Sequence, residues 1–206
     1  MPNVLQYYPR QPAGFIHAQM QGHHWEKATG HDVVVSKGFT ALKPLAFTAE
    51  AEETIHDFRA PVKNESRIPQ RIFGGFKRCL YPVQKFQSDP ERVLSVILDR
   101  ESEKWVRPSR GQFQIFYKWV ADQRECQPDF VAQTAERIYM LEPKARNDLQ
   151  DHELVAKKDS AVRWCQHASE HSAKNGGKPW KYLLIPHDAV AENMSIGGLA
   201  AQFACG

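Results

Sequence analysis

The sequence lacks the paired cysteines that mark a structural zinc site or a disulfide framework. Its four cysteines, Cys79, Cys126, Cys165 and Cys205, are scattered without any C-x-x-C pair. Neither a zinc ribbon nor a disulfide-stapled scaffold is therefore indicated. Unpaired thiols are typical of a reducing compartment, so we expect a cytoplasmic protein.

Long apolar runs are missing as well. No stretch approaches the roughly 18 consecutive apolar residues of a membrane-spanning helix, and the N-terminus lacks the basic-then-apolar order of a secretory signal. The chain also has no internal repeat and no low-complexity tract. It contains no G-x-x-x-x-G-K-[ST] phosphate loop, so no ATP-hydrolysing site is expected.

The overall composition is that of an ordinary globular protein. The 206 residues are 42% hydrophobic and 25% charged, which is enough for one good core or for one core and a smaller lobe. The formal net charge is +3. This mild excess of positive charge permits a nucleic-acid partner without requiring one.

Two apolar segments in the middle of the chain predict a β-hairpin. Residues 128–133 and 137–144 are rich in β-branched, aromatic and long apolar side chains, with polar residues between the two runs. Side chains alternate along a strand, so Glu142 and Lys144 share one face of the second strand, and Asp129 lies on one face of the first. If these faces coincide, two carboxylates and an ammonium group converge.

Such a trio suits the metal-assisted hydrolysis of a phosphodiester. Asp129 and Glu142 can hold Mg²⁺, a hard cation that prefers oxygen ligands. The Lys144 ammonium can orient the attacking water or neutralise charge in the transition state. The alternative is a surface hairpin on which Glu142 and Lys144 form an ordinary solvated ion pair.

A helix is expected to precede the hairpin. Ser88 or Asp89 can cap it, Pro90 suits its first turn, and apolar residues continue at helical spacing to about residue 103. Glu91 in the first turn has two open interpretations. It either stabilises the helix dipole or points at the metal site.

Further elements complete an α-β-β-β-α-β order followed by a last helix, which predicts a layered α/β core. The additional segments are a strand at 112–117, a helix at 148–174 broken near 151–152, a buried parallel strand at 180–186 and a helix at 189–203. Glycines in residues 71–78 indicate either a backbone that approaches phosphate or, more simply, a turn between two strands.

This order divides the chain into two expected parts. Residues 1–85 form an N-terminal extension of irregular and short β segments, the latter at 33–36 and 39–47. Residues 86–206 form the domain that holds the hairpin.

The element order, with Pro-Asp at the second strand and Glu-x-Lys closing the third, resembles the restriction-endonuclease-like fold of PD-(D/E)xK nucleases. More narrowly, the chain is similar to the C-terminal endonuclease portion of the restriction (Res) subunit of type III restriction enzymes and related helicase-nucleases. The matching segments are Phe39-Thr40, Phe58-Arg59-Ala60-Pro61, Phe73-Gly74-Gly75-Phe76-Lys77-Arg78, Ser88-Asp89-Pro90-Glu91-Arg92, Pro128-Asp129-Phe130-Val131, Glu142-Pro143-Lys144, Trp164-Cys165, Lys178-Pro179-Trp180 and Ile185-Pro186-His187-Asp188.

The resemblance implies an Mg²⁺-dependent DNA endonuclease domain. Asp129 and Glu142 would be metal ligands, Lys144 the catalytic lysine, and Glu91 a further helix-borne acid at the metal. Relatives often have Glu-Thr after the second strand, whereas this chain has Gln133 before the threonine. That difference puts an auxiliary carboxylate there in doubt.

The resemblance also implies partners. In that family the domain acts on double-stranded DNA, follows a superfamily 2 ATPase and works with a modification methyltransferase subunit. The ATPase half is absent here, so the chain is expected to be a fragment, a split-gene product or a decayed copy. The alternative function is a catalytically silent DNA-binding or assembly module that docks on a helicase or methyltransferase subunit.

Overall fold

A computed structural model describes residues 41–45, 47, 54–113, 115–119 and 122–206. Contacts divide the chain into two compact units, 1–37 and 38–206, and all the described residues belong to the second unit. The boundary expected at residue 85 falls inside this second unit. The short β segment predicted at 33–36 lies outside the described residues.

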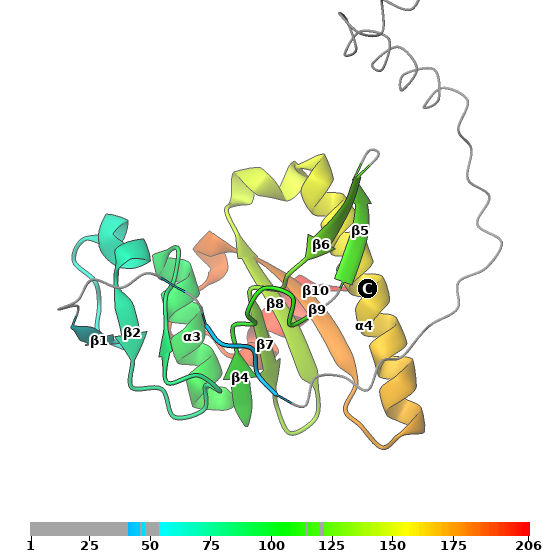
Figure 1. Cartoon of the computed structure of the whole chain (residues 1–206), viewed down its shortest axis with the longest axis horizontal. Helices are drawn as coiled ribbons and strands as arrows, with labels where there is room; N and C mark the ends of the chain where they lie inside the picture. The colour runs from blue at the N-terminus through cyan, green and yellow to red at the C-terminus, as the bar shows by residue number, and fades with distance from the viewer. Residues whose placement is uncertain (1–40, 46, 48–53, 114, 120–121) are drawn as a thin grey trace, which may run out of the picture. The chain divides into compact units, whose positions relative to one another are not determined.

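The second unit is a mixed α/β structure around a five-stranded sheet (Figure 1). The strands are β4 (Lys104–Val106), β7 (Phe130–Gln133), β8 (Ile138–Lys144), β9 (Trp180–Pro186) and β10 (Ala204–Cys205), in the spatial order β10-β9-β8-β7-β4. β8 and β9 are parallel, and the other neighbours are antiparallel. The hairpin predicted at 128–144 is confirmed as β7 and β8, and the parallel pairing predicted for 180–186 is confirmed as well.

Local sequence explains where the helices begin. α3 (Asp89–Glu101) starts after Ser88, whose hydroxyl accepts a hydrogen bond from the Glu91 amide, as the capping pattern predicts. α4 (His152–Lys174) is capped by Asp151 and follows the short 3-10 helix η2 (Arg146–Gln150), which confirms the predicted break. α5 (Ile196–Phe203) is shorter than predicted, because the chain first makes the 3-10 turn η3 (His187–Ala189) and recaps at Ser195.

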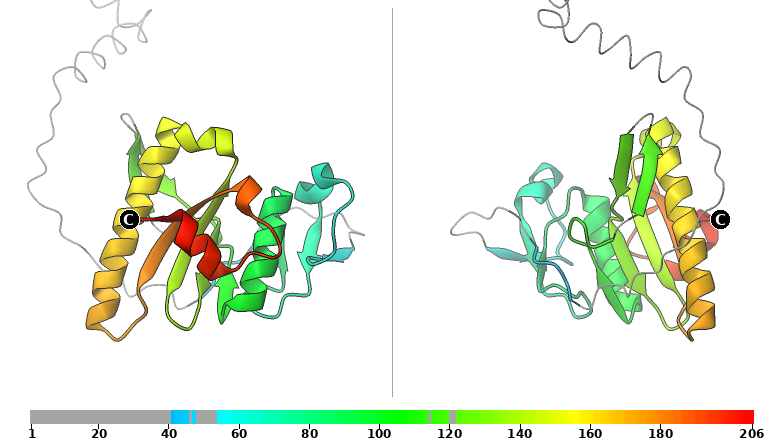
Figure 2. Two further views of the ribbon diagram at one scale, coloured as in Figure 1. Left: turned by 180° about the vertical axis from the view of Figure 1, so that it is seen from behind. Right: turned by 45° about the vertical axis from the view of Figure 1, so that its right-hand side comes forward.

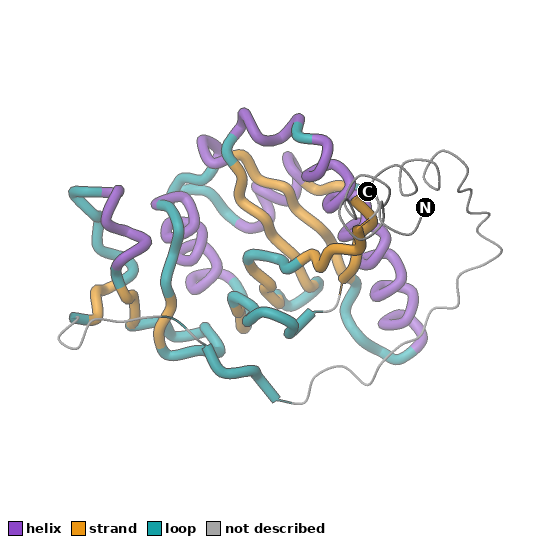
Figure 3. Tube along the Cα trace, turned by 45° about the horizontal axis from the view of Figure 1, so that its top comes forward, coloured by secondary structure: helices purple, strands orange, loops and turns teal. Residues whose placement is uncertain are grey.

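The helices and a separate hairpin cover the two faces of the sheet (Figure 2). α3 and α5 pack against one face of the sheet and form a single hydrophobic core with it. The helices contribute Leu94, Ile97, Leu98, Ile196 and Leu199. The strands contribute, from alternate positions, Phe130, Ala132, Leu141, Leu183 and Ile185. α4 and the hairpin of β5 (Ile115–Trp119) and β6 (Asp122–Cys126) cover the other face. In Figure 3 the strands lie in the centre with helices on either side.

The burial of β9 agrees with its apolar sequence. Leu183 and Ile185 are fully buried, and Leu184 is half-buried on the opposite face. β9 has neighbours on both edges, and β8 is the middle strand of the sheet.

One strand assignment was wrong. The first strand after α3 is β4, and β4 pairs with β7 with Trp105 opposite Ala132. The segment predicted at 112–117 instead forms β5, which pairs with β6 in a two-stranded sheet of its own. β4 has only three residues, too few to display the alternation that identifies a strand from sequence.

A smaller three-stranded sheet precedes α3. It contains β1 (Ile55–Asp57), β2 (Ile72–Gly74) and β3 (Val83–Gln84), with the 3-10 helix η1 (Glu65–Gln70) between the first two strands. Its buried Phe58, Phe73 and Phe86 belong to the same hydrophobic core as α3. Among the described helices, none is long and apolar enough to cross a membrane.

Candidate active site

The pairing of β7 with β8 brings the two predicted carboxylates to one place. Phe130 pairs with Leu141 in the antiparallel register, so the same register extended by one residue puts Asp129 opposite Glu142. Both residues then lie on the sheet face that α4 covers, together with Lys144. The predicted convergence of faces is thus what the strand geometry produces.

The Lys144 ammonium lies between the two acids. Its Nζ is 3.3 Å from Glu142 Oε1 and 3.7 Å from Asp129 Oδ2. The side chains of Lys144 and Asp129 are 32% and 23% exposed, whereas the Glu142 side chain is fully buried. The alternative of a solvated surface ion pair at Glu142 is therefore wrong.

Asp129 has an oxygen without a hydrogen-bond partner. Among the described residues, its Oδ2 is the buried side-chain polar atom that lacks one. Burial raises the pKa of Asp129 to about 6, and the Glu142 carboxylate adds to this rise, while the Lys144 ammonium opposes it. A buried carboxylate oxygen in this state is open to a cation.

Glu142 is held by more groups than the sequence indicated. The Lys157 ammonium of α4 makes a short ion pair with Glu142 Oε1, and the Tyr182 hydroxyl of β9 donates a hydrogen bond to Oε2 at 3.2 Å. Burial is the largest single effect on the pKa of Lys157 and lowers it, but the charge of Glu142 and its hydrogen bond, together with smaller contributions from Cys126 and Asp129, outweigh burial and raise that pKa. Lys157 therefore stays protonated at neutral pH.

Sequence reasoning missed both of these partners. Nothing in the helical pattern separates Lys157 from its neighbour Lys158. Tyr182 carried a weak signal, because a tyrosine in a nearly continuous apolar strand needs a hydrogen-bond partner for its hydroxyl.

Glu91 lies near the site and is engaged by other groups. Its Oε2 is 2.9 Å from the guanidinium of Arg107 and accepts a hydrogen bond from the Gln87 amide at 2.9 Å. Its charge still contributes to the raised pKa of Asp129. Within the described residues, no group of three or more His, Cys, Asp or Glu side chains is arranged to hold a metal ion.

Gln133 lies at the other end of β7. It pairs with Ile138 beside the hairpin turn, and its amide donates to Glu103 at 2.9 Å. It therefore stands away from Asp129, the residue at the opposite end of the strand.

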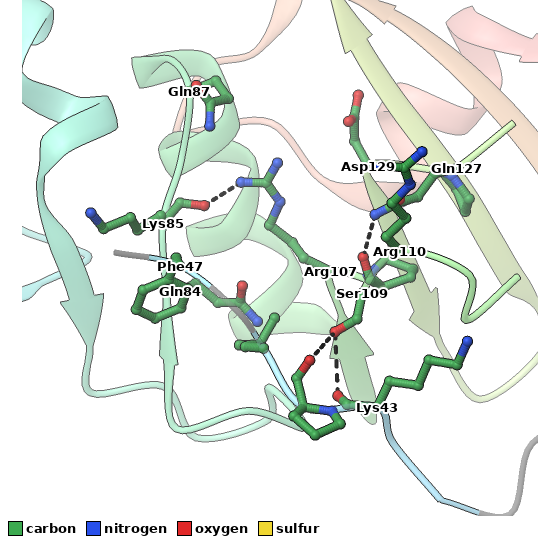
Figure 4. Close-up of a pocket in the computed structure, with 14 residues that line it drawn as sticks. Lys43, Phe47, Gln84, Lys85, Gln87, Arg107, Ser109, Arg110, Gln127 and Asp129 are labelled. Atoms are coloured by element: carbon green, nitrogen blue, oxygen red, sulfur yellow. Dashed lines mark hydrogen bonds between the residues drawn. The ribbon is translucent and has the colours of Figure 1, made fainter. Parts of the chain in front are cut away.

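A pocket of about 540 Å³ opens beside Asp129 (Figure 4). Its lining comes from four parts of the chain, namely residues 43–45 with Phe47, residues 84–85 with Gln87, residues 107–110 and residues 127–129. The lining contains four cationic residues, Lys43, Lys85, Arg107 and Arg110, and Asp129 is the one acid among the described residues that line it. The pocket therefore favours an anionic ligand.

The glycine-containing segment 71–78 contains β2 and the start of the loop that connects β2 to β3, which agrees with the simpler of the two interpretations. The backbone amides of Lys77 and Arg78 donate to the Asp99 carboxylate of α3, at 3.1 and 2.8 Å. These amides are satisfied by the chain itself and do not face a phosphate site. Gly75 takes a positive φ of 87° in this loop, a conformation that favours glycine.

Comparisons of the chain with protein-family models, curated proteins and solved structures found no match.

Proposed function

We propose that the chain is a metal-dependent nuclease domain that hydrolyses phosphodiester bonds of DNA. One observation carries the proposal. The Lys144 ammonium lies near both carboxylates, those of Asp129 and Glu142, which face each other at one end of the β7–β8 hairpin. The order α3, β4, β7, β8, α4, β9 supports a restriction-endonuclease-like core, although its first strand is β4 and not the segment expected.

The residues present fit a hard divalent cation. Asp129 and Glu142 would hold Mg²⁺ through carboxylate oxygens, and the unpartnered Oδ2 of Asp129 is the oxygen most open to it. When bound, the ion polarises a phosphoryl oxygen and acidifies water. Glu91 would not be a metal ligand, because Arg107 already neutralises its carboxylate.

The chain's own residues have distinct roles in this hydrolysis. A water oxygen forms a bond to phosphorus, the bond from phosphorus to the leaving sugar oxygen breaks, and the proton that the water loses passes to solvent while the leaving oxygen takes one up. Lys144 places positive charge where the phosphoryl group becomes more anionic and can orient the water. Lys157 and Tyr182 hold the Glu142 carboxylate in one orientation.

The proposed partners follow from the same resemblance. We propose double-stranded DNA as the substrate, a superfamily 2 ATPase half or subunit as the motor, and a modification methyltransferase subunit as the source of target recognition in a type III-like restriction system.

The second candidate, a catalytically silent DNA-binding or assembly module, is favoured by one observation. Both oxygens of Glu142 already have partners in Lys144, Lys157 and Tyr182. A carboxylate held in this way can serve as a structural ion pair and need never bind metal.

Cleavage of plasmid DNA separates the two functions. We expect the purified chain to nick or linearise plasmid in Mg²⁺ and to lose this activity in EDTA. Asp129→Asn should abolish cleavage, whereas Asp159→Asn, which changes an exposed acid on α4, should not. If wild type and Asp129→Asn are equally inactive in Mg²⁺ and in Mn²⁺, with the ATPase partner present, the silent module is the better account.

A further inference from the structure

The pocket beside Asp129 combines features that recognise a nucleotide. Its cationic side chains suit phosphate, and its wall also contains the aromatic ring of Phe47 and the amides of Gln84 and Gln127. An aromatic face can stack on any base, and amides can hydrogen-bond to a base edge. A volume of about 540 Å³ lies within the range of small-ligand sites.

Two of the cations are available for phosphate. Lys43 and Arg110 are exposed, and neither has a carboxylate partner within the described part of the chain. Lys43 Nζ donates to the Gly111 carbonyl at 2.7 Å, which holds its charge at the rim without neutralising it. Both cations can therefore pair with an anionic backbone that runs past the pocket.

Arg107 connects the pocket wall to the candidate active site. Its guanidinium lies 5.2 Å from the centre of the Phe130 ring and 2.9 Å from Glu91 Oε2. These contacts fix Arg107 in place, as a group that positions a ligand must be fixed. Asp129 itself lines the pocket, so a ligand there lies next to the Asp129 carboxylate, whose Oδ2 has no hydrogen-bond partner.

We infer that the pocket binds one unpaired nucleotide of a DNA strand, next to the phosphate that the Asp129 and Glu142 site would cleave. A base inside an intact duplex cannot enter a pocket of this kind, because it is stacked and paired. Within the proposed double-stranded substrate, the pocket therefore takes a locally opened segment, and a single strand is the simplest probe of that state. The inference rests on the proposed nuclease function, since Asp129 joins the pocket to the chemistry.

Binding measured without cleavage tests the inference. We would follow the fluorescence anisotropy of a labelled short oligothymidylate and of a matched duplex with the full chain in EDTA. We expect the single strand to bind about tenfold more tightly than the duplex, because binding the duplex requires unpairing and unstacking. Equal affinities for the two, or tighter binding of the duplex, would overturn the inference.

Variants locate the binding on the chain. Phe47→Ala should weaken single-strand binding by about fivefold to a hundredfold, the range for losing one base–aromatic stack, and leave duplex binding unchanged. Phe47→Trp should retain binding and thus show that the loss is not a folding defect. The matched control is Phe116→Ala, which removes a half-exposed ring on β5 away from the pocket lining. If Phe47→Ala and Phe116→Ala bind alike, the pocket is not the site.

A charge-reversal variant provides a second, independent test of the binding site. Arg110→Glu should weaken single-strand binding more than Arg137→Glu, which makes the same change on an exposed arginine at the turn of the β7–β8 hairpin. Equal weakening by the two would indicate non-specific attraction and overturn the inference. A free mononucleotide that competes as strongly as the oligonucleotide would also overturn it, because the strand would then be unnecessary.

The two proposals fail in different ways. If the binding results hold but no DNA is cleaved in Mg²⁺, the nuclease function fails and the pocket remains a single-strand site on a silent module. If plasmid is cleaved but the Phe47 and Arg110 variants bind normally, the nuclease function holds and the pocket inference fails.

Discussion

Asp129 and Glu142 carry the same charge in different surroundings. Glu142 is fully buried, and two lysines and a tyrosine surround its oxygens. Asp129 is partly exposed, and its Oδ2 lacks a hydrogen-bond partner. The arrangement therefore favours a fixed charge at Glu142 and a carboxylate at Asp129 that responds to protons and cations.

The raised pKa of Asp129 makes a testable contribution to stability. The pKa rises from an ordinary 3.8 to about 6 on folding, mainly through burial. The native state then holds a proton that the unfolded chain has already lost, so stability falls as the pH rises through this interval. Asp129→Asn removes the effect. We expect the variant to match wild type near pH 4 and to exceed it by up to roughly 3 kcal/mol at pH 7.

Urea denaturation across this pH range measures the difference. Mg²⁺ should stabilise wild type at pH 7 and leave the Asn variant unchanged, because the cation compensates a charge that only wild type carries. Asp159→Asn serves as the control, since its side chain is 59% exposed. A constant difference between wild type and Asp129→Asn from pH 4 to pH 7 would contradict the assignment.

Glu142 and Lys157 should be strongly coupled. Glu142→Gln leaves the largely buried Lys157 ammonium without its counter-charge, a change that typically costs about 3–5 kcal/mol. Lys157→Met should cost less, because the Lys144 ammonium remains 3.3 Å from Glu142 Oε1. The double variant should recover much of the loss, because both charges are then gone.

A double-mutant cycle from thermal or urea unfolding measures this coupling. Lys158→Met provides the matched control, as Lys158 is adjacent in sequence and pairs instead with Asp159 at 3.7 Å. Additive losses in the cycle would mean that the Glu142–Lys157 ion pair does not form.

Lys144 should matter for chemistry more than for binding. Its ammonium faces both carboxylates and remains 32% exposed, so its removal leaves both carboxylate ligands in place. We expect Lys144→Ala to retain Mg²⁺ and DNA binding and to lose turnover by about two orders of magnitude or more. Single-turnover cleavage together with calorimetric Mg²⁺ titration checks this. A loss of Mg²⁺ affinity as large as that of Asp129→Asn would assign Lys144 to metal binding.

At the level of residues, the sequence predicted the part of the site that depends on strand periodicity. Asp129, Glu142 and Lys144 lie on two consecutive strands, and the alternation of side chains brings them together whatever the rest of the fold does. Lys157 and Tyr182 reach the site from α4 and β9, whose approach depends on long-range packing. No local pattern in the sequence carries that information.

At the level of elements, α3 organises the chain on its N-terminal side. Asp99 near the end of α3 accepts hydrogen bonds from the amides of Lys77 and Arg78 and from the Trp105 indole at 3.1 Å. It thereby ties the loop between β2 and β3 to α3 and to β4. β4 in turn pairs with β7, the strand that Asp129 precedes.

Loss of this carboxylate should loosen the connection. Asp99→Ala leaves several partly buried donors unpaired, and we expect it to lower the free energy of unfolding by about 3 kcal/mol. Asp159→Ala on exposed α4 should change it by less than about 0.5 kcal/mol. Urea denaturation compares the two variants. Equal stabilities would mean that water replaces Asp99 without cost.

The elements that sequence reasoning found are those with strong local signals. α3 has a capping serine and a proline, and β9 has a continuous apolar run. β4 and β10 have three and two residues, and β6 is polar and largely exposed. Such strands exist because a neighbouring strand supplies hydrogen bonds, which is tertiary information that the local sequence does not contain.

At the level of the whole molecule, the charge is distributed unevenly. The net charge of the chain is only +3, yet four cationic residues line one pocket. Nucleic-acid binding should therefore depend on that pocket more than on a general attraction to the surface.

This distribution predicts the salt dependence of DNA binding. A single strand that contacts the two cations available for phosphate, Lys43 and Arg110, should give a slope of about −1.4 for the logarithm of affinity against the logarithm of salt concentration. The affinity should be weak and independent of sequence, with a dissociation constant on the order of 10⁻⁴–10⁻⁶ M at physiological salt. Arg110→Glu should reduce the magnitude of the slope by about one, whereas Arg137→Glu should leave it unchanged.

Anisotropy titrations of several defined sequences across a salt series test this expectation. Selectivity for one sequence, or an affinity that does not change with salt, would require base-edge contacts outside the pocket. A partner that recognises the target would then be unnecessary. A slope much steeper than about −1.4 that Arg110→Glu leaves unchanged would mean that cations elsewhere on the chain bind the backbone. A slope of about −1.4 that falls with Arg110→Glu alone places the phosphate contacts at the pocket beside Asp129, where cleavage is proposed to occur.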